Sequence, residues 1–331
     1  MSSTRLDVLC IGNAIVDVIA NATDALLHTE GLVKGSMRLI DADEAERLYS
    51  HMGPAQQVSG GSAGNTAAGL AALGGRAAFI GQVAPDQLGK FYRHDLTAAG
   101  VEFITPANDV GLPTARSMIL VTPDGHRTMN TFLGAAQHLP ASALDEDQIR
   151  SSSILYLEGY LWDPETPRFA MVRAIEVARE ADRKVAFTLS DTFCVDRHRE
   201  GFIELLDSGR IDILFANQAE VEALAGIAHL ETAVEVIKGK VETLVVTRSE
   251  DGALATQAGE RADVSAEPIR ELVDTTGAGD LFAAGFLFGQ ARGKSLEQSL
   301  RLGAICAAEV IQHYGARPEA DLRALAGELA A

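Results

Sequence analysis

The stretch DTTGAGDLFAAGFLF, residues 274–288, places two aspartates around a run of small residues and continues directly into apolar residues. The spacing of the apolar residues predicts a helix that starts near Gly279 and buries one face. Unpaired backbone donors and the helix dipole favour an anion at such an N-terminus. The donors would be the N–H groups of Gly277, Ala278, Gly279 and Asp280. The alternative is a tight turn of small residues before a core helix, with no ligand.

The rest of the chain predicts an α/β fold. Its 331 residues, 47% hydrophobic and 22% charged, suit one large domain with an appendage or two domains. Short apolar runs typical of buried strands alternate with amphipathic helical stretches, which predicts a mostly parallel central sheet with helices on both faces. The strand candidates are Val8–Ile11, Ala77–Ile80, Ile154–Leu157, Val185–Leu189, Ile211–Phe215 and Leu244–Thr247. Helices are expected over Leu281–Gln290, Ser295–Tyr314 and Ala320–Ala330.

Two segments show β-like alternation instead. They lie between Ala14 and Ile40 and between Val101 and Phe132, and the second contains the hairpin signal Pro123-Asp124-Gly125. We expect a small β lid, formed by residues 15–40 and 101–132. Residues 1–14, 41–100 and 133–331 would form the large nucleotide-binding and catalytic domain. Such a lid would cover the strand ends, where open α/β sheets bind ligands.

Charge and cysteine content exclude several classes of protein. The formal net charge of −18 argues against nucleic acid or an anionic membrane as a partner. Cys10, Cys194 and Cys306 lack the spacing of a disulfide framework or a zinc site. Neither a signal peptide nor a membrane helix is evident. We therefore expect a cytoplasmic protein.

A second glycine-rich stretch, SGGSAGNTAAGLAALGG, covers residues 59–75. Gly60 and Gly61 would let the backbone approach a ligand, and Asn65 belongs to a small-residue helix that could equally serve only for packing. Other phosphate-binding patterns are absent. GQARGKS at 289–295 has one residue too few between its glycines for a P-loop, and GNAIVD follows the first strand where a dinucleotide fold needs GxGxxG.

Three elements together resemble the ribokinase-like (PfkB) carbohydrate and nucleoside kinases. They are Gly60-Gly61 with Asn65, the NxxE element from Asn217 to Glu220, and DTTGAGDLFAAGF. The resemblance covers nearly the whole chain and implies a ribokinase-like fold. Within the family, GNAIVD, HRTMNTFLGAA and DILFANQAE are similar to stretches of adenosine kinases.

This resemblance implies ATP-dependent transfer of the γ-phosphoryl group to a primary hydroxyl, here the 5'-hydroxyl of adenosine. Asp280 would accept the hydroxyl proton, and Gly277, Ala278 and Gly279 would form an anion hole, with Arg127 near the transferred phosphate. A carboxylate with a pKa of about 4 is a weak base at neutral pH. Alignment and charge stabilisation should therefore matter more than base strength.

The resemblance also implies cations. Asp280 faces a polyanion, so Mg²⁺ on the ATP phosphates is expected, positioned by Asn217 and by Glu220 through water. The alternative for this pair is an ordinary capping box at a helix start. Asp274, Thr276 and Gly315 match family positions around a monovalent cation, commonly K⁺.

The substrate sites follow from the same matches. The acceptor's ribose would be held by Asn13, Asp17, Gly61, Ser62 and Asn65, and a carboxylate that accepts from two neighbouring hydroxyls would select a cis-diol. ATP would contact Thr247, Ser249 and Gly252, with serine in place of a family glycine. The base would lie among apolar residues, although Met37 stands where a glutamine is expected. These residues are Ile15, Met37, Phe132, Leu133 and Tyr160.

Two other functions remain open. One is a sugar kinase of the same family, acting on ribose, fructose or a 2-keto-3-deoxygluconate-type sugar acid. The other is a non-catalytic nucleotide or sugar sensor on the same fold. In every case the partner is a small-molecule nucleoside or sugar, and the protein would be a monomer or a homodimer.

Overall fold

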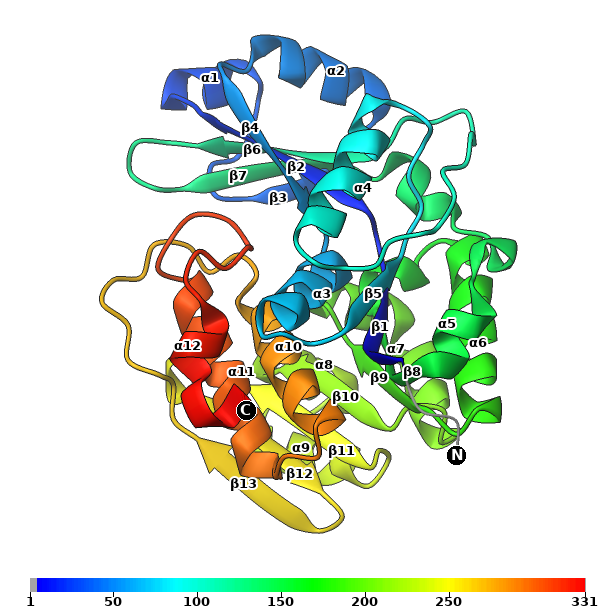
Figure 1. The fold of residues 1–331 in the computed structure, drawn as a ribbon. Coiled ribbons are helices and arrows are strands. Elements are labelled where there is room, and N and C mark those ends of the chain that lie inside the picture. The colour runs from blue at the N-terminus through cyan, green and yellow to red at the C-terminus, as the bar shows by residue number, and fades with distance from the viewer. Residues whose placement is uncertain (1–4, 331) are drawn as a thin grey trace.

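The computed structural model describes residues 5–330. Within them, the central element is an eight-stranded sheet in the order β13-β12-β11-β10-β9-β8-β1-β5 (Figure 1). From β5 to β11 all neighbours are parallel, while β12 and β13 are antiparallel. The strands are β1 (Leu6–Ile11), β5 (Ala77–Ile80), β8 (Ser152–Glu158), β9 (Lys184–Thr188), β10 (Ile213–Asn217), β11 (Thr243–Thr247), β12 (Ala253–Gln257) and β13 (Glu260–Val264). Every predicted strand is therefore present.

Helices cover both faces of this sheet, as the apolar runs predicted. Alternate residues of β1 separate the two cores, because Val8 and Cys10 face one side and Leu9 and Ile11 the other. The first core contains α3 (Ser62–Ala72), α4 (Gln87–Ala98), α10 (Ala278–Ala291), α11 (Leu296–Val310) and α12 (Leu322–Ala326). The second contains α5 (Glu146–Ser151), α6 (Glu165–Glu180), α7 (Thr192–Asp207), α8 (Gln218–Ala225) and α9 (Leu230–Lys238). Short 3₁₀ helices span Gly134–His138, Ala141–Ala143, Gly159–Trp162, Ser249–Asp251 and Gly327–Ala330.

A second, smaller sheet stands at one end of the molecule (Figure 1). Its order is β3-β7-β6-β2-β4, and β6 and β7 form the expected hairpin around Pro123-Asp124-Gly125. Helices α1 (Asp24–Thr29) and α2 (Ala42–His51) pack on it through a core of their own. The strands are β2 (Ile15–Asn21), β3 (Met37–Leu39), β4 (Ala55–Gly60), β6 (Ala115–Val121) and β7 (Arg127–Phe132).

The small sheet recruits more of the chain than the sequence suggested. Strand β4 pairs antiparallel with β2, although residues 41–100 were assigned to the large domain. Helix α2 likewise buries Ala45 and Leu48 in the core of the small sheet. The sequence AQQVSG of β4 is mostly polar and exposed, so it lacks the apolar pattern that would have predicted a strand.

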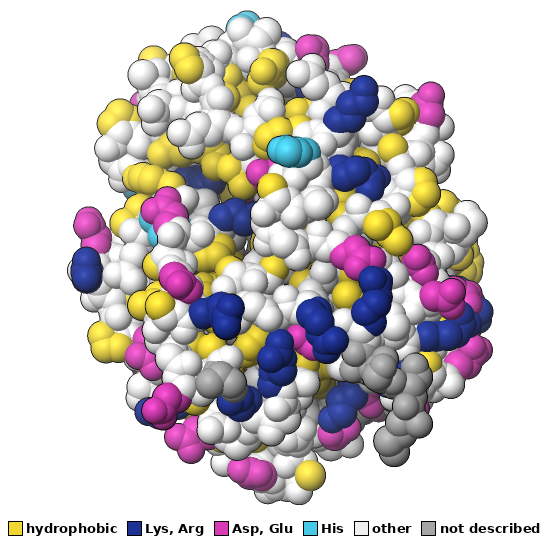
Figure 2. Space-filling model, viewed as in Figure 1, with side chains coloured by type: hydrophobic (Ala, Val, Ile, Leu, Met, Phe, Trp, Pro, Cys, Tyr) yellow, Lys and Arg dark blue, Asp and Glu magenta, His cyan; other side chains and the backbone are white. Residues whose placement is uncertain are grey.

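Two further features bear on the sequence predictions. None of the helices in residues 5–330 has the length and apolar character needed to cross a bilayer. The three cysteines are buried and unpaired, in agreement with the absence of a disulfide framework. Figure 2 shows hydrophobic side chains, together with some Lys and Arg side chains, along the boundary between the small sheet and the large domain, and charged side chains of both signs are scattered over the large domain on this face.

Candidate active site

A cavity of about 730 Å³ lies between the small sheet and the carboxyl ends of the large sheet's strands. Its walls combine the ends of β1, β8, β10 and β11, the first turns of α3, α7 and α10, and strands of the small sheet. The cavity thus lies where a parallel sheet is expected to bind a ligand. The predicted site residues that line it are Asn13, Asp17, Met37, Gly61, Ser62, Asn65, Tyr160, Asn217, Glu220, Thr247, Thr276, Gly277, Gly279 and Asp280.

The start of α10 supplies free backbone donors. Its N-cap, Gly277, has φ +80° and no side-chain cap, and a Cβ there would stand 2.6 Å from the Cβ of Ala316. Among the described residues, nothing accepts a hydrogen bond from the N–H of Gly277 or Gly279. Ala278 differs from these two glycines, because its N–H donates to Thr275 O at 3.2 Å and the residue does not line the cavity.

Asp280, in the first turn of α10, is oriented by two residues of α3. Ser62 Oγ donates to one carboxylate oxygen at 2.7 Å, and Asn65 Nδ2 donates to the other at 2.9 Å. Burial raises the pKa of Asp280, while these two hydrogen bonds and the nearby charge of Arg317 oppose the shift. The second glycine-rich stretch therefore reaches the first one, over more than 200 positions of sequence.

Glu158, at the end of β8, is a functional candidate that the sequence analysis missed. Its side chain is completely buried and accepts from Asn13 N and Asn13 Nδ2, both at 2.7 Å, and from Ala63 N at 2.8 Å. It therefore fixes the loop after β1 against the start of α3. An acidic residue directly after a predicted buried strand was the signal that could have identified it.

Two buried acceptors in the cavity have no donor. Asn13 Oδ1 and Asn65 Oδ1 are inaccessible to solvent and lack a hydrogen-bond partner within residues 5–330. Asp17 lies in the same wall, and burial raises its pKa to about 6 against the opposing charges of Arg127 and Arg317. Because unpaired buried polar atoms are costly, these oxygens suit a ligand that carries hydroxyl groups.

The glycines at 60 and 61 permit a close approach between two parts of the chain, whereas the sequence predicted a close approach to a ligand. A Cβ on Gly61, which has φ +84°, would stand 2.1 Å from Asn13 O. A Cβ on Gly60 would stand 2.5 Å from Asp17 Oδ2. Since real Cβ atoms do not approach that closely, both positions require glycine to bring Asn13, Asp17 and Ser62 into one wall.

The residues predicted to surround a monovalent cation lie together, but an arginine side chain forms an ion pair with their carboxylate, Asp274. Asp274 Oδ1 accepts from Thr276 N at 3.1 Å and Thr276 Oγ1 at 2.7 Å, and Oδ2 accepts from Gly315 N at 3.1 Å. Arg127 Nη1 also donates to Oδ2, in an ion pair whose side chains are 7% and 6% exposed. Arg127 therefore lies on Asp274 and not in the cavity wall, which differs from its predicted place beside the phosphate.

Asn217 and Glu220 form the capping box that was the alternative interpretation of NxxE. Asn217 Oδ1 accepts from Glu220 N, and Glu220 Oε2 accepts from Asn217 N, both at 2.9 Å. Glu220 is also buried, which raises its pKa to about 7, and both residues line the cavity. The capping role is thus confirmed, and the carboxylate still faces the cavity.

Of the three residues predicted to contact ATP, one lines the cavity and two lie in the turn behind it. Thr247, at the end of β11, lines the cavity, whereas Ser249 and Gly252 do not. Ser249 has φ +51°, a left-handed conformation that explains why glycine is usual at this position of the family motif. A Cβ on Gly252 would stand 2.0 Å from Val264 O, so that residue serves the turn between β11 and β12.

The cavity wall beyond the aspartates is apolar. Met37 and Tyr160 line it as predicted, together with Leu39 and Phe193, which the sequence analysis did not single out. Phe132 packs in the core of the small sheet instead, because its side chain points toward α1 and α2. Ile15 and Leu133 also line the cavity.

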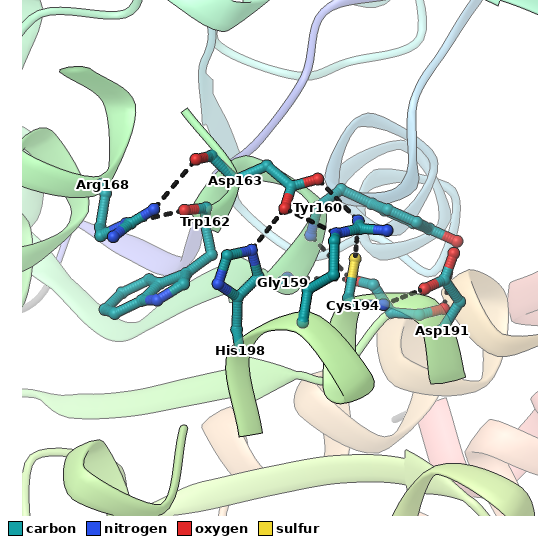
Figure 3. Close-up of polar contacts among 10 residues, drawn as sticks. Gly159, Tyr160, Trp162, Asp163, Arg168, Asp191, Cys194 and His198 are labelled. Carbon is teal, nitrogen blue, oxygen red and sulfur yellow. Dashed lines mark hydrogen bonds and ion pairs between the residues drawn. The ribbon is translucent and has the colours of Figure 1, made fainter. Parts of the chain in front are cut away.

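Hydrogen bonds hold this apolar wall in place (Figure 3). Tyr160 OH donates to Ser190 O at 3.1 Å, and Asp191 caps α7 by accepting from Cys194 N at 2.6 Å. Asp163 accepts from two guanidinium nitrogens of Arg197, Nε at 3.0 Å and Nη2 at 2.7 Å, and contacts the ring of His198. His198 interrupts α7 with a non-helical backbone, so Asp163 contacts α7 at this interruption.

The buried carboxylates predict how stability depends on pH. Burial raises the pKa of Asp17 to about 6 and those of Glu158 and Glu220 to about 7. Each folded-state pKa then exceeds the unfolded value of about 4. Folding is therefore not opposed by these groups below about pH 4, where they are protonated in both states, and it loses stability as pH rises through the folded values, because the buried carboxylates must then ionise. Urea unfolding should show the contribution of these carboxylates as a free energy of unfolding that falls from about pH 4 to 7 and levels off above about pH 7.

Glu158→Gln provides the control for this pH dependence. The amide keeps an acceptor for Asn13 but cannot titrate, so the slope of stability against pH should be smaller in the variant. Equal slopes in the variant and the original chain would contradict the assignment to Glu158.

Comparison with known proteins agrees with this geometry. An adenosine kinase structure from Sinorhizobium meliloti is 50% identical, covers 97% of this chain and 98% of its own, and superposes with a TM-score of 0.90. A probable sugar kinase from Rhizobium etli is 48% identical, covers 98% of both chains, and has a TM-score of 0.91. The adenosine kinase of Saccharomyces cerevisiae is 27% identical over 92% of this chain and 94% of its own.

The family assignment rests on more than these pairwise similarities. The model of the pfkB family carbohydrate kinases matches residues 5–322, which include both glycine-rich stretches, the capping-box pair and the cavity between the two sheets. The chain belongs to the pfkB carbohydrate kinase family, and it is accordingly an ATP-dependent kinase that phosphorylates an alcohol group.

Proposed function

We propose that this kinase phosphorylates the 5'-hydroxyl of adenosine. The observation that carries the proposal is the composition of the cavity wall. Amide oxygens without a hydrogen-bond donor, which could accept from hydroxyl groups of a ligand, lie there next to apolar side chains. A nucleoside has this composition, since its ribose is rich in hydroxyl groups and its base is flat and apolar on both faces. The similarity to adenosine kinases supports adenine as the base.

The ribose would lie at the polar end of the cavity. Asn13 Oδ1, Asn65 Oδ1 and the Asp17 carboxylate can accept hydrogen bonds from hydroxyls there. An acceptor without those hydroxyls would leave the two amide oxygens unpaired and would bind more weakly. We therefore expect discrimination against deoxynucleosides.

The base would lie at the apolar end. Met37, Leu39 and Phe193 are 49%, 58% and 68% exposed, although all three line the cavity. Exposed large apolar residues that converge on one cavity indicate a surface that a ligand covers. Met37 and Leu39 belong to β3 of the small sheet, so movement of this sheet toward the large domain would enclose the base and exclude water.

The residues around Asp280 would then perform the transfer. Ser62 and Asn65 hold the carboxylate so that it can accept the proton of the acceptor hydroxyl and align that hydroxyl with the phosphoryl group. The free N–H groups of Gly277 and Gly279 would stabilise charge on the phosphoryl oxygens, at about 3 kcal/mol for each well-placed donor. Most of the rate enhancement then comes from alignment and charge stabilisation.

Mg²⁺ and ATP would lie at the end of the cavity that Asn217, Glu220 and Thr247 line. The described residues contain no cluster of three potential metal ligands, which suits an ion that keeps much of its water and is held largely by ATP phosphates. Glu220 would contact that water, because its carboxylate lines the cavity while Asn217 fixes its orientation. The bound ion would neutralise phosphate charge opposite Asp280.

A sugar kinase is the second candidate. The probable sugar kinase of R. etli is as similar to this chain as the S. meliloti adenosine kinase, and the hydroxyl acceptors would serve a free sugar equally well. The apolar wall distinguishes the two candidates, since a sugar would leave Met37, Leu39 and Phe193 uncovered.

The test is a measurement of ADP release with a panel of nucleosides and sugars, including ribose, fructose and 2-keto-3-deoxygluconate. We expect turnover with adenosine, weaker turnover with deoxyadenosine, and little with sugars. Turnover on a sugar without turnover on adenosine would overturn the proposal for the acceptor. Phe193→Ala should raise the KM for adenosine and leave the KM for any sugar substrate unchanged.

The Arg127–Asp274 ion pair leads to a prediction about K⁺. A monovalent cation at Asp274 would compete with the guanidinium that already neutralises this carboxylate. Arg127→Gln should therefore increase the activation by KCl relative to NaCl, by several-fold over the original chain. The measurement is kcat/KM in about 0.1 M of each salt. An equal K⁺ response in both proteins would contradict competition at Asp274.

A further inference from the structure

The segment Gly315-Ala316-Arg317 touches separate parts of the site. It lies in the loop between α11 and α12, drawn in red beneath the small sheet in Figure 1. Gly315 N donates to Asp274, and Ala316 packs against Gly277 so tightly that a Cβ on that glycine would stand 2.6 Å away. Arg317 extends in the other direction, toward the turn between β4 and α3.

Arg317 binds that turn through main-chain carbonyls. Its Nη1 donates to Gly64 O at 3.0 Å, and its Nη2 donates to Ser59 O and to Ser59 Oγ, the latter at 2.9 Å. The two carbonyls flank Gly61 and Ser62, so the guanidinium spans the turn. Within the described chain, no carboxylate lies within 4.0 Å of this guanidinium, so no ion pair neutralises its charge.

The same turn is held from its other side. Ser59 N and Ser59 Oγ donate to Asp95 Oδ2 at 2.8 and 2.7 Å, and Tyr92 OH donates to Gly60 O at 3.1 Å. The turn then presents Ser62 and Asn65 to Asp280. Arg317 thus binds directly to the turn whose residues Ser62 and Asn65 orient the Asp280 carboxylate.

We propose that Arg317 is a positioning residue for phosphoryl transfer, which clamps the β4–α3 turn in the geometry that orients Asp280 and supplies positive charge to the acceptor site. The inference rests on the proposed kinase mechanism, because it assigns Arg317 a role in positioning the Asp280 carboxylate and the acceptor substrate. Arg317 acts through Ser62, Asn65 and the electrostatic field and does not itself touch the reacting atoms.

The charge distribution agrees with this role. Arg317 stabilises the ionised forms of Asp17 and Asp280, whose pKa values burial raises. Loss of its charge should raise both pKa values further, because a nearby cation favours a carboxylate. Asp17 on β2 and Asp280 on α10 also face each other's charge. The other titratable groups near them are Tyr92 and Asp95 on α4, Arg127 on β7, Tyr156 and Glu158 on β8, and Tyr160 after β8.

Two substitutions separate geometry from charge. Arg317→Met removes both, and should lower kcat/KM for the acceptor about 10²-fold and shift the acid limb of its pH profile upward by about one unit. Arg317→Lys keeps the charge but lacks the planar fork that reaches two carbonyls. It should lower kcat/KM about tenfold and leave the acid limb unchanged.

Arg93→Met is the matched control. Arg93 also donates to two main-chain carbonyls, those of Phe103 and Thr105, and forms none of the contacts of the acceptor turn. Its replacement should lower the melting temperature without moving the acid limb or the KM for the acceptor. An unshifted acid limb in Arg317→Met, or the same shift in Arg93→Met, would overturn the proposal.

The remaining outcomes are also decisive. If Arg317→Met does not fold, the lysine variant decides, since full activity in it would show that the forked contact is dispensable. If the original chain phosphorylates no acceptor in the panel, the proposed function fails, and the Asp280 carboxyl can still be titrated by ¹³C NMR with Asp280→Asn for assignment. A higher Asp280 pKa in Arg317→Met than in the original chain supports the inference, and an unchanged one refutes it.

Discussion

Replacement of Asp280 by asparagine should lower kcat by about 10²–10⁴-fold while the KM for the acceptor changes only a few-fold. The amide cannot accept the hydroxyl proton, although its oxygen can still accept from Asn65 Nδ2 while its N–H groups face the Ser62 hydroxyl, which can accept. Asn13 and Asp17 would still hold the acceptor. Steady-state kinetics with ATP and the preferred acceptor measure both constants.

Stability distinguishes lost chemistry from lost structure in this variant. Because burial raises the pKa of Asp280, the ionised carboxylate is unfavourable there, and a neutral isostere should fold at least as well. Asp145→Asn is a suitable control, since Asp145 caps α5 by accepting from Gln148 N at 3.0 Å and asparagine caps equally well. Full activity in Asp280→Asn would refute the assigned role of this carboxylate.

Gly61→Ala should produce the second large effect, a loss of about 10²-fold in kcat/KM for the acceptor with clear destabilisation. The added Cβ would stand 2.1 Å from Asn13 O, so the loop after β1 must move and take the Asn13 side chain out of place. The backbone of Gly61, with φ +84° and ψ 139°, adds a separate cost of about 1–3 kcal/mol for any residue with a Cβ.

Gly259→Ala is the control for a positive φ without a steric contact. Gly259 has φ +87°, close to the +84° of Gly61, but a Cβ there would meet no atom within 4 Å. Chemical unfolding and kinetics of both variants should show a similar small strain at Gly259 and a much larger loss, with a raised KM, at Gly61. Equal effects of the two substitutions would show that the contact with Asn13 is unimportant.

The sequence predicted the fold and the cavity correctly for physical reasons that are local. The predicted strands of the large sheet contain continuous apolar runs, and the α10 N-terminus follows from small residues before a run of apolar residues. Strand β4 escaped prediction because its residues are polar and its place depends on pairing with β2. The hydrogen bond from Ala278 N to Thr275 O likewise depends on how the turn before the helix folds.

The partners of the charged groups were decided only by the tertiary structure. Arg127 and Asp274 are 147 positions apart, Asn13 and Glu158 are 145 apart, and Arg317 and Ser59 are 258 apart. Motif spacing determined that Asp280 and the glycines around it stand at a helix start, because helix periodicity and backbone donors are properties of a short segment. Which arginine neutralises Asp274, and which one clamps the acceptor turn, depends on how the two sheets and the loop after α11 pack together, since a charge selects its partner by distance in space.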